Sequence, residues 1–125
     1  MPWIIAAIVL LLILARRASA TTIGGDVQIK PGVNLAGLQP QMVLALNVAD
    51  DVYRSRGHVL TITSANDSQH MDSSLHYSGF AVDLRTKDLP PADVPEIAEA
   101  IKAQLGSQYD VIQEMDHIHV EFDPK

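Results

Sequence analysis

The sequence predicts an α+β domain, with a small, mainly antiparallel β-sheet flanked by two helices and preceded by an N-terminal hydrophobic segment. Three observations lead to this fold class. Residues 40–56 and 94–105 repeat apolar side chains at three- and four-residue spacing, which is typical of amphipathic helices. Several short stretches alternate apolar and polar side chains, which is typical of half-buried strands. An uninterrupted apolar run at residues 3–15 precedes all of them.

Length and composition limit the classes of protein that fit. The 125 residues are enough for one compact domain with a single core. Fifteen Asp and Glu residues outnumber nine Lys and Arg residues, for a formal net charge of −6, so we expect no nucleic-acid partner. The chain has no cysteine, which excludes disulfide scaffolds, thiol nucleophiles and thiolate metal sites. Any metal must therefore bind to histidines and carboxylates.

The apolar start of the chain is typical of a signal peptide or a short membrane anchor. As a helix, residues 3–15 would be about 20 Å long, shorter than the roughly 30 Å hydrocarbon core of a membrane. The Ala-Ser-Ala sequence at 18–20 fits a cleavage site and favours export. Arg16 and Arg17 follow the run, as in an anchor that holds the domain on the cytoplasmic side. We expect export to the periplasm or cell envelope, or membrane anchoring by residues 1–20, with membrane contact only through the apolar run.

The globular domain is expected to span residues 39–125. Residues 21–38 are rich in glycine and proline, which indicates a linker with one short strand at 27–30. Residues 40–56 predict the first helix, with a proline near its start and Gly57 just past its end. Its apolar positions are Met42, Val43, Leu46, Ala49, Val52 and Tyr53.

Four short strands complete the predicted sheet. Residues 58–64 alternate and are rich in β-branched side chains, and residues 80–84 predict a second strand after the polar, turn-rich loop 66–78. Residues 109–113 and 117–122 predict the last two strands. Because few residues separate these two strands, we expect them to form an antiparallel hairpin.

The second helix is predicted between the two pairs of strands. Asp93 is placed to cap a helix that begins at residue 94, and Gly106 ends it. Its apolar face, Ile97, Ile101 and Leu105, is expected in the core.

Four of the five histidines lie in two short segments that are also rich in carboxylates, residues 68–85 and 114–123. In the first segment, Gly79, Ala81 and Asp83 share one face of the predicted strand, because side chains alternate along a β-strand. The small side chains on this face leave room for a metal ion and its substrate to approach the backbone. A histidine in the preceding loop can reach the same place.

In the second segment, His117 and His119 share a face of the last predicted strand. The opposite face is apolar and is expected in the core. The two strands therefore each direct a His- or Asp-bearing face toward a common cleft. The apolar residues of the second strand are Ile118, Val120 and Phe122.

This set of residue types suits a catalytic metal. Two imidazoles and one carboxylate, with a fourth position for water, form a recurring catalytic zinc site. Zinc held in this way activates water and polarises a carbonyl oxygen. A nearby carboxylate must then take up a proton, and Asp116 and Glu114 are the candidates.

The first segment carries the pattern Ser74-x-His76-x-x-Gly79-x-Ala81-x-Asp83, and an acidic-x-x-His element follows downstream. Together they closely resemble the signature of the zinc D-alanyl-D-alanine carboxypeptidases, D,D-dipeptidases and L-alanyl-D-glutamate endopeptidases, which share a fold with the hedgehog signalling domain. The first motif matches at all five of its defining positions. The resemblance covers roughly residues 60–123, and it implies a peptidoglycan substrate.

By this resemblance, His76 and Asp83 would bind Zn²⁺ together with the histidine of the acidic-x-x-His element. That element occurs twice, ending once at His117 and once at His119. We prefer the second, because family members commonly continue with an apolar residue and Glu after the ligand, as residues 120–121 do.

The resemblance also implies the roles of the residues around the metal. His119 would be the third ligand and Asp116 the general base, with Glu114 as the alternative base. His117 would stabilise the oxyanion or orient the substrate. We expect Ser74 to orient its loop by local hydrogen bonding and not to act as a nucleophile.

One feature of the family is absent from this chain. Family members usually carry an arginine upstream of the first motif, in a Ser-Gly-x-Arg-like stretch, where it positions substrate. Here residues 63–67 read Thr-Ser-Ala-Asn-Asp. The candidates to replace the arginine are His70, Arg54, Arg56 and Arg85.

The expected function is therefore that of a monomeric zinc peptidase that cuts an amide bond in peptidoglycan stem peptides. A D-Ala-D-Ala carboxypeptidase of a bacterial envelope and an L-Ala-D-Glu endopeptidase of the endolysin type both fit. The alternative is a non-catalytic, zinc-containing binding or structural module of the same fold, which the absent arginine favours. We expect Glu121 and Asp123 to be solvated or supporting carboxylates and not ligands.

Overall fold

The computed structural model describes residues 23–24, 26–65 and 79–124. It shows an α+β architecture with two helices and one five-stranded mixed sheet. The predicted N-terminal segment and the predicted loop 66–78, with Ser74, His70 and His76, lie outside the described residues. No helix within the described ranges is long and apolar enough to span a membrane.

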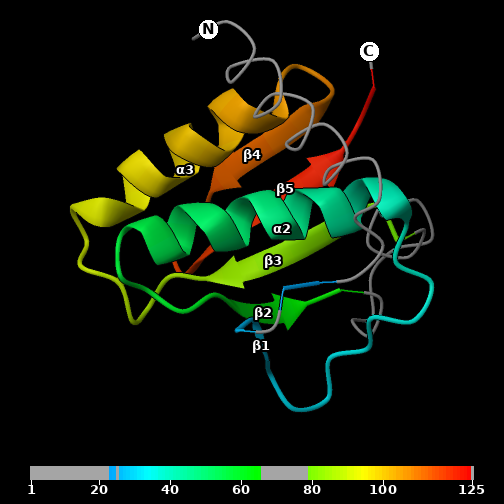
Figure 1. The fold of residues 1–125 in the computed structure, drawn as a ribbon, viewed down its shortest axis with the longest axis horizontal. Helices are drawn as coiled ribbons and strands as arrows, with labels where there is room; N and C mark the ends of the chain where they lie inside the picture. The colour runs from blue at the N-terminus through cyan, green and yellow to red at the C-terminus, as the bar shows by residue number, and fades with distance from the viewer. Residues whose placement is uncertain (1–22, 25, 66–78, 125) are drawn as a thin grey trace, which may run out of the picture.

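The sheet is mainly antiparallel, as predicted. Its strand order is β1-β2-β3-β5-β4, with β1 parallel to β2 and every other neighbouring pair antiparallel. The bounds in chain order are β1 (Gln28–Ile29), α2 (Pro40–Ser55), β2 (Thr61–Ser64), β3 (Ala81–Arg85), α3 (Asp93–Leu105), β4 (Tyr109–Gln113) and β5 (His117–Phe122), as Figure 1 shows.

Most predicted elements are present, with small shifts at their ends. The hairpin of β4 and β5 has the predicted bounds and is antiparallel. The strand predicted from residue 58 begins only at Thr61, because His58 belongs to the turn after α2, where its backbone N–H donates to the Tyr53 carbonyl. The strand predicted at 80–84 is shifted by one residue and ends at Arg85.

The prediction that Asp93 caps the second helix is wrong. The capping position is Ala92, which already has helical backbone angles, so Asp93 is the first residue of the helix. The turn before it is closed by the Asp93 N–H, which donates to the Pro90 carbonyl. The Asp93 carboxylate instead lies 3.2 Å from Nε2 of His58, and this contact joins the start of α3 to the turn after α2.

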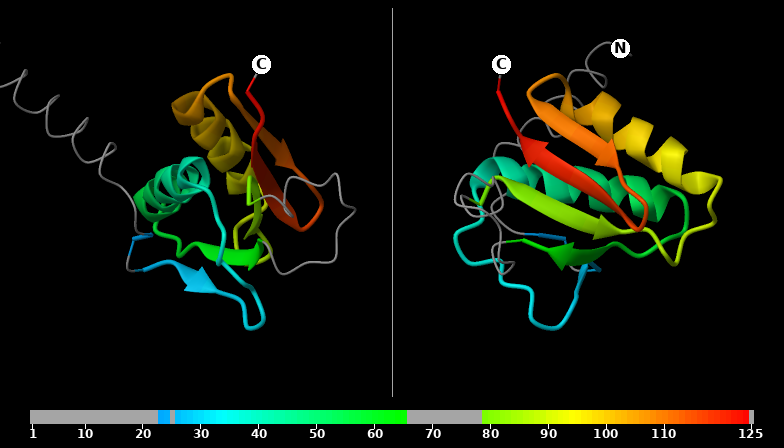
Figure 2. Two further views of the ribbon diagram at one scale, coloured as in Figure 1. Left: turned by 90° about the vertical axis from the view of Figure 1, so that its right-hand side faces the viewer. Right: turned by 180° about the vertical axis from the view of Figure 1, so that it is seen from behind.

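Both helices cover the same face of the sheet, and the core lies between this face and the helices (Figure 2). We call the opposite face, which neither helix covers, the open face. The sheet buries Ile62, Val82, Leu84, Ile118 and Val120 against this helical layer, and burial of one such side chain stabilises a fold by roughly 1.5 to 3 kcal/mol. From the helices, the fully buried side chains include Met42, Leu46, Tyr53, Ile97 and Ile101. The alternation predicted for β3 and β5 is therefore observed, and their polar side chains occupy the open face.

The segment before α2 packs against the same core. Val27, Val33, Leu35 and Leu38 are partly buried against it, and β1 adds an edge strand through backbone hydrogen bonds to β2. Close backbone contact also joins this segment to the start of β3, because the Gln39 N–H donates to the Gly79 carbonyl at 3.0 Å.

Gly79 is needed at that contact for two reasons. Its φ is +79°, a conformation that costs other residues about 1 to 2 kcal/mol. A Cβ at this position would also overlap the carbonyl oxygen of Gly37. The structure thus gives a folding role to a glycine that the sequence singled out as part of a motif.

We predict that Gly79→Ala lowers the free energy of unfolding by at least about 2 kcal/mol, because strain and overlap add. Gly32→Ala is the matched control, because Gly32 also has a positive φ but no atom of the described part of the chain lies within 4 Å of its Cβ position. This control should lose only the stability that the positive φ costs, about 1 to 2 kcal/mol. Urea unfolding of both variants measures the difference, and equal losses would contradict the role of the Gly37 contact.

Asp50 is a buried carboxylate on α2. It is 2% exposed, its Oδ2 atom lies 3.2 Å from Nε of Arg54, and its Oδ1 atom has no hydrogen-bond partner among the described residues. Burial is the main cause that raises the pKa of Asp50, and Arg54 opposes it. The ionised carboxylate therefore reduces stability above its raised pKa, and protonation relieves this cost as the pH falls.

We predict that Asp50→Asn raises the free energy of unfolding at pH 7, by on the order of 1 kcal/mol, because a neutral amide is less costly to bury. The gain should shrink as the pH falls through the raised pKa of the wild-type carboxyl toward the ordinary Asp value of about 4, because the folded protein then buries a neutral carboxyl. Asp51→Asn, at an exposed neighbour that also pairs with Arg54, should change stability little at either pH. Urea unfolding at both pH values tests this, and destabilisation by Asp50→Asn at pH 7 would contradict it.

Candidate functional site

The pairing of β3 with β5 places Asp83 directly opposite His119 on the open face of the sheet. The Nδ1 atom of His119 lies 2.9 Å from Oδ1 of Asp83. Both side chains are mostly shielded, with 15% and 19% exposure. Two of the three predicted metal ligands are thus in contact, although they lie 36 residues apart in the sequence. The third, His76, lies outside the described residues.

His119 contacts a second carboxylate through its other ring nitrogen. Its Nε2 atom lies 2.9 Å from Oε1 of Glu121, which occupies the same face two residues along β5. A neutral imidazole has only one N–H, so it can donate to one of these carboxylates but not both. The hydrogen bond to Asp83, assisted by Glu121, raises the pKa of His119, while burial acts in the opposite direction.

His117 lies beside this pair and connects it to the turn between β4 and β5. Its Nε2 atom is 3.7 Å from Oδ1 of Asp83, and its Nδ1 atom is 2.6 Å from Oδ1 of Asp116. Asp116 lies in the turn and is 82% exposed. Its hydrogen bond to His117 lowers the pKa of the Asp116 carboxyl, so this group is ionised at neutral pH.

The two candidates for a general base are placed differently. Asp116 borders a pocket together with His117 and Asp83. Glu114 is exposed and does not line that pocket, and its backbone N–H donates to the carbonyl of His117 to close the hairpin. Of the two, only Asp116 has its carboxylate beside the predicted metal ligands.

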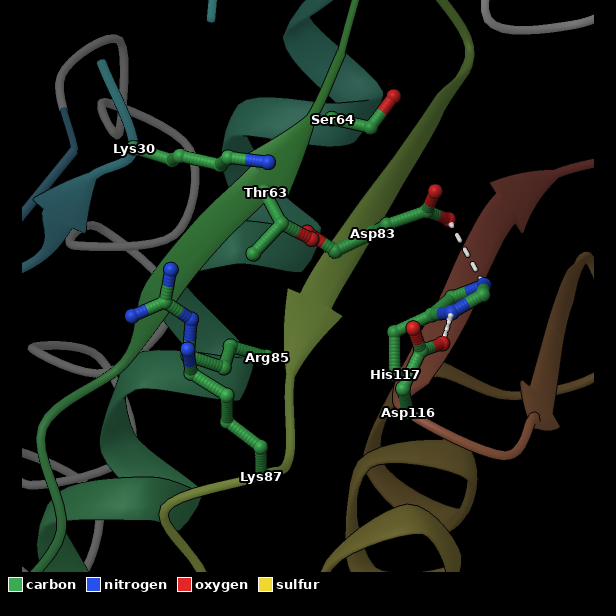
Figure 3. Close-up of a pocket in the computed structure, with 8 residues that line it drawn as sticks. All are labelled: Lys30, Thr63, Ser64, Asp83, Arg85, Lys87, Asp116 and His117. Atoms are coloured by element: carbon green, nitrogen blue, oxygen red, sulfur yellow. Dashed lines mark hydrogen bonds and ion pairs between the residues drawn. The ribbon is translucent and has the colours of Figure 1, made fainter.

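The pocket has a volume of about 340 Å³ and lies over β2 and β3, at the edge of the Asp83–His117 contact (Figure 3). We call it the β2–β3 pocket. Its carboxylates and imidazole lie on one side, and its cationic side chains lie on the other, over β2. It is lined by Lys30, Thr63, Ser64, Asp83, Arg85, Lys87, Asp116 and His117.

Only one of the candidates for the missing upstream arginine is found at this pocket within the described chain. Arg85 lines it, two residues beyond Asp83 on the same strand face and directly opposite His117. Arg54 is paired with carboxylates on α2, and Arg56 is 2.6 Å from Oε2 of Glu96 on α3. The fourth candidate, His70, is outside the described residues.

Sequence reasoning missed two cationic members of the site and did not predict the contact partner of a third residue. Lys30 and Lys87 were not expected at all, and Glu121 was expected only as a solvated or supporting carboxylate. Glu121 was detectable, because the His-x-Glu spacing on a strand places both side chains on one face. Lys30 was not detectable from the sequence, because it reaches the pocket only through the parallel pairing of β1 with β2.

A second group of carboxylates lies on β4 and at the end of β5, and it shares one residue with the His119 contacts. Asp110, Glu121 and Asp123 bring carboxylate oxygens within 4.8 Å of one another, with Asp110 opposite Glu121 in the register of β4 and β5. This set has oxygen donors only, which suits hard cations and not the mixed nitrogen and oxygen site predicted for zinc. Glu121 belongs to both groups.

Comparison with known proteins adds no family to this picture. A scan against protein-family models finds no match, and no curated protein matches the chain. The candidate function therefore rests on the motif residues and on the geometry around Asp83 and His119.

Proposed function

We propose that this chain is a zinc-dependent peptidase that hydrolyses an amide bond in the stem peptides of peptidoglycan. The reaction is that of a D-Ala-D-Ala carboxypeptidase or of an L-Ala-D-Glu endopeptidase of the endolysin type. The observation that carries the proposal is the direct contact between Asp83 and His119, the last residue of one motif and the histidine of the other. His76 completes the proposed ligand set.

The donor atoms suit zinc. Asp83 offers a carboxylate oxygen and His119 offers Nδ1, and zinc binds both atom types. Histidines that bind zinc commonly donate their other N–H to a carboxylate, which fixes the ring and the tautomer. Glu121 already occupies that position at Nε2. A neutral His119 can therefore bind the metal through one ring nitrogen and donate a hydrogen bond to Glu121 through the other.

The residues around the ligands supply the proton-transfer chemistry. Zinc, when bound, polarises the amide carbonyl and activates water. Asp116 is ionised at neutral pH and exposed at the pocket, so it can accept a proton and return it to the leaving amine. His117 holds Asp116 through Nδ1 and turns Nε2 toward Asp83, where it can also stabilise negative charge on the substrate oxygen.

The proposed setting follows from the start of the chain. Residues 1–20 act as a signal peptide or a short anchor, and the domain works as a monomer in the periplasm or cell envelope. An acidic chain has little general attraction for anionic wall polymers, so wall recognition must come from the site itself.

One observation favours a second candidate, a non-catalytic zinc-containing module that binds stem peptides. The stretch that usually carries an arginine has none, and Arg85 approaches the pocket from a different strand. Asp116 and His117 beside the ligands favour catalysis. The activity experiment below separates the two candidates.

We predict that Asp83→Asn and His119→Gln each weaken zinc binding by about a hundredfold or more, because each removes a ligand. Glu121→Gln should weaken it by about 10- to 100-fold, as other changes to carboxylates behind ligating histidines do. Competition with a fluorescent zinc chelator measures these affinities. Glu114→Gln controls for loss of a carboxylate and should bind as the wild type does. Asp110→Asn tests the acidic group, and zinc loss in that variant alone would contradict the proposed site.

We predict that the zinc-loaded full chain releases new amino termini or D-alanine from cell-wall sacculi, and that a chelator stops the release. Asp116→Asn should reduce the rate by about 10²- to 10⁴-fold while zinc stays bound, because it removes the general base. Glu114→Gln should retain nearly full activity. Mass spectrometry of the products identifies the bond. Zinc binding without any release would favour the non-catalytic module, and unchanged activity in Asp116→Asn would exclude Asp116 as the base.

A further inference from the structure

The β2–β3 pocket concentrates positive charge in an acidic protein. The chain has a formal net charge of −6, and the structure describes six of its lysines and arginines. Three of these six, Lys30, Arg85 and Lys87, line this one pocket. The other three are Arg54, Arg56 and Lys102.

The three cationic side chains of the pocket form no strong ion pair with other described residues. Among the described residues, Lys30 and Lys87 form no ion pair, and both side chains are exposed. Arg85 lies 3.8 Å from Asp88, whose side chain is 72% exposed, so this contact is loose and screened by water. Arg54 and Arg56, by contrast, are held by carboxylates at 3.2 Å or less. The pocket therefore presents cations that remain available to a ligand.

The fold holds these cations at one side of the pocket. Lys30 follows β1, and its backbone N–H donates to the Ile62 carbonyl of β2 at 3.0 Å. The Arg85 backbone is anchored to α2, because the buried hydroxyl of Tyr53 donates to the Arg85 carbonyl at 2.9 Å. In Figure 3 the three cationic side chains gather over β2, whereas Asp83, Asp116 and His117 lie across the pocket.

We propose that Lys30, Arg85 and Lys87 form a subsite that binds the carboxylates of an acidic peptide, beside the amide that lies at Asp83 and His119. The inference rests on the proposed function and adds the substrate class to it. A ligand with negative charge at one end and a neutral amide at the other matches both sides of the pocket. An extended polyanion does not, because Asp83 and Asp116 would repel it.

The probe is N-acetyl-L-Ala-D-Glu, compared with its diamide, in which both carboxylates are neutral. Binding to the full chain in detergent is followed by amide chemical shifts, with a chelator present so that zinc plays no part. The acid should bind saturably and shift the amides of Lys30, Arg85 and Lys87, whereas the diamide should not. Equal binding of acid and diamide would overturn the proposal. Inorganic phosphate that binds as tightly as the peptide would also overturn it, because the site would then be a general anion site.

Charge-matched variants test the residues. Lys30→Gln and Lys87→Gln should each raise the dissociation constant of the acid by about threefold or more, as expected for loss of one solvent-accessible ionic contact. Lys102→Gln removes the same charge from the exposed face of α3 and should leave binding unchanged. Equal effects of all three variants would overturn the subsite, because binding would then depend only on net charge.

The same variants separate this inference from the proposed function. If the chelated protein binds the acid but the zinc-loaded protein cleaves no wall peptide, the subsite is supported and the peptidase is not. If wall peptides are cleaved but Lys30→Gln and Lys87→Gln match Lys102→Gln in KM and in binding, the peptidase is supported and the subsite is overturned.

Discussion

The register between β3 and β5 is the constraint on which the site depends. Side chains alternate along a strand, so a slip of one residue would move Asp83 into the core and an apolar side chain onto the open face. The observed pairing sets Asp83 opposite His119 and Leu84 opposite Ile118 in the same ladder. Burial of the apolar pairs under α2 and α3 therefore selects the pairing that brings the polar pair together. The energy that fixes the site comes from the hydrophobic face and not from the polar groups themselves.

Backbone contacts at the start of β3 support the same register. The positive φ of Gly79 turns the chain into the strand, and its carbonyl accepts a hydrogen bond from Gln39 at the start of α2. This contact ties β3 to the segment before the helix, which also supplies β1 and Lys30. Thus one glycine is linked both to the strand that carries Asp83 and to the segment that carries a cation of the β2–β3 pocket.

Local sequence patterns predicted the elements and strand faces that follow from the periodicity of apolar residues. They did not predict contacts between segments that are distant in the sequence. Both helices, the β4–β5 hairpin and the faces of Asp83, His117 and His119 followed from the spacing of apolar residues. The parallel pairing of β1 with β2 leaves no local pattern, so the position of Lys30 could not be predicted. Asp93 looked like a helix cap by residue type, but the turn before it is closed by a backbone hydrogen bond, which frees its carboxylate for His58.

The separation of charge in the β2–β3 pocket favours one orientation of a bound ligand over the reverse. At physiological salt, charges are screened over about 8 Å, so the acidic surface as a whole exerts little influence on a ligand inside the pocket. The nearby groups dominate instead, with cations over β2 and carboxylates at Asp83 and Asp116. A peptide with its carboxylates over β2 places neutral backbone next to the carboxylates, and the reversed orientation would bring like charges together. The same separation that would admit the proposed acidic peptide would thus also determine which of its amides lies next to His119.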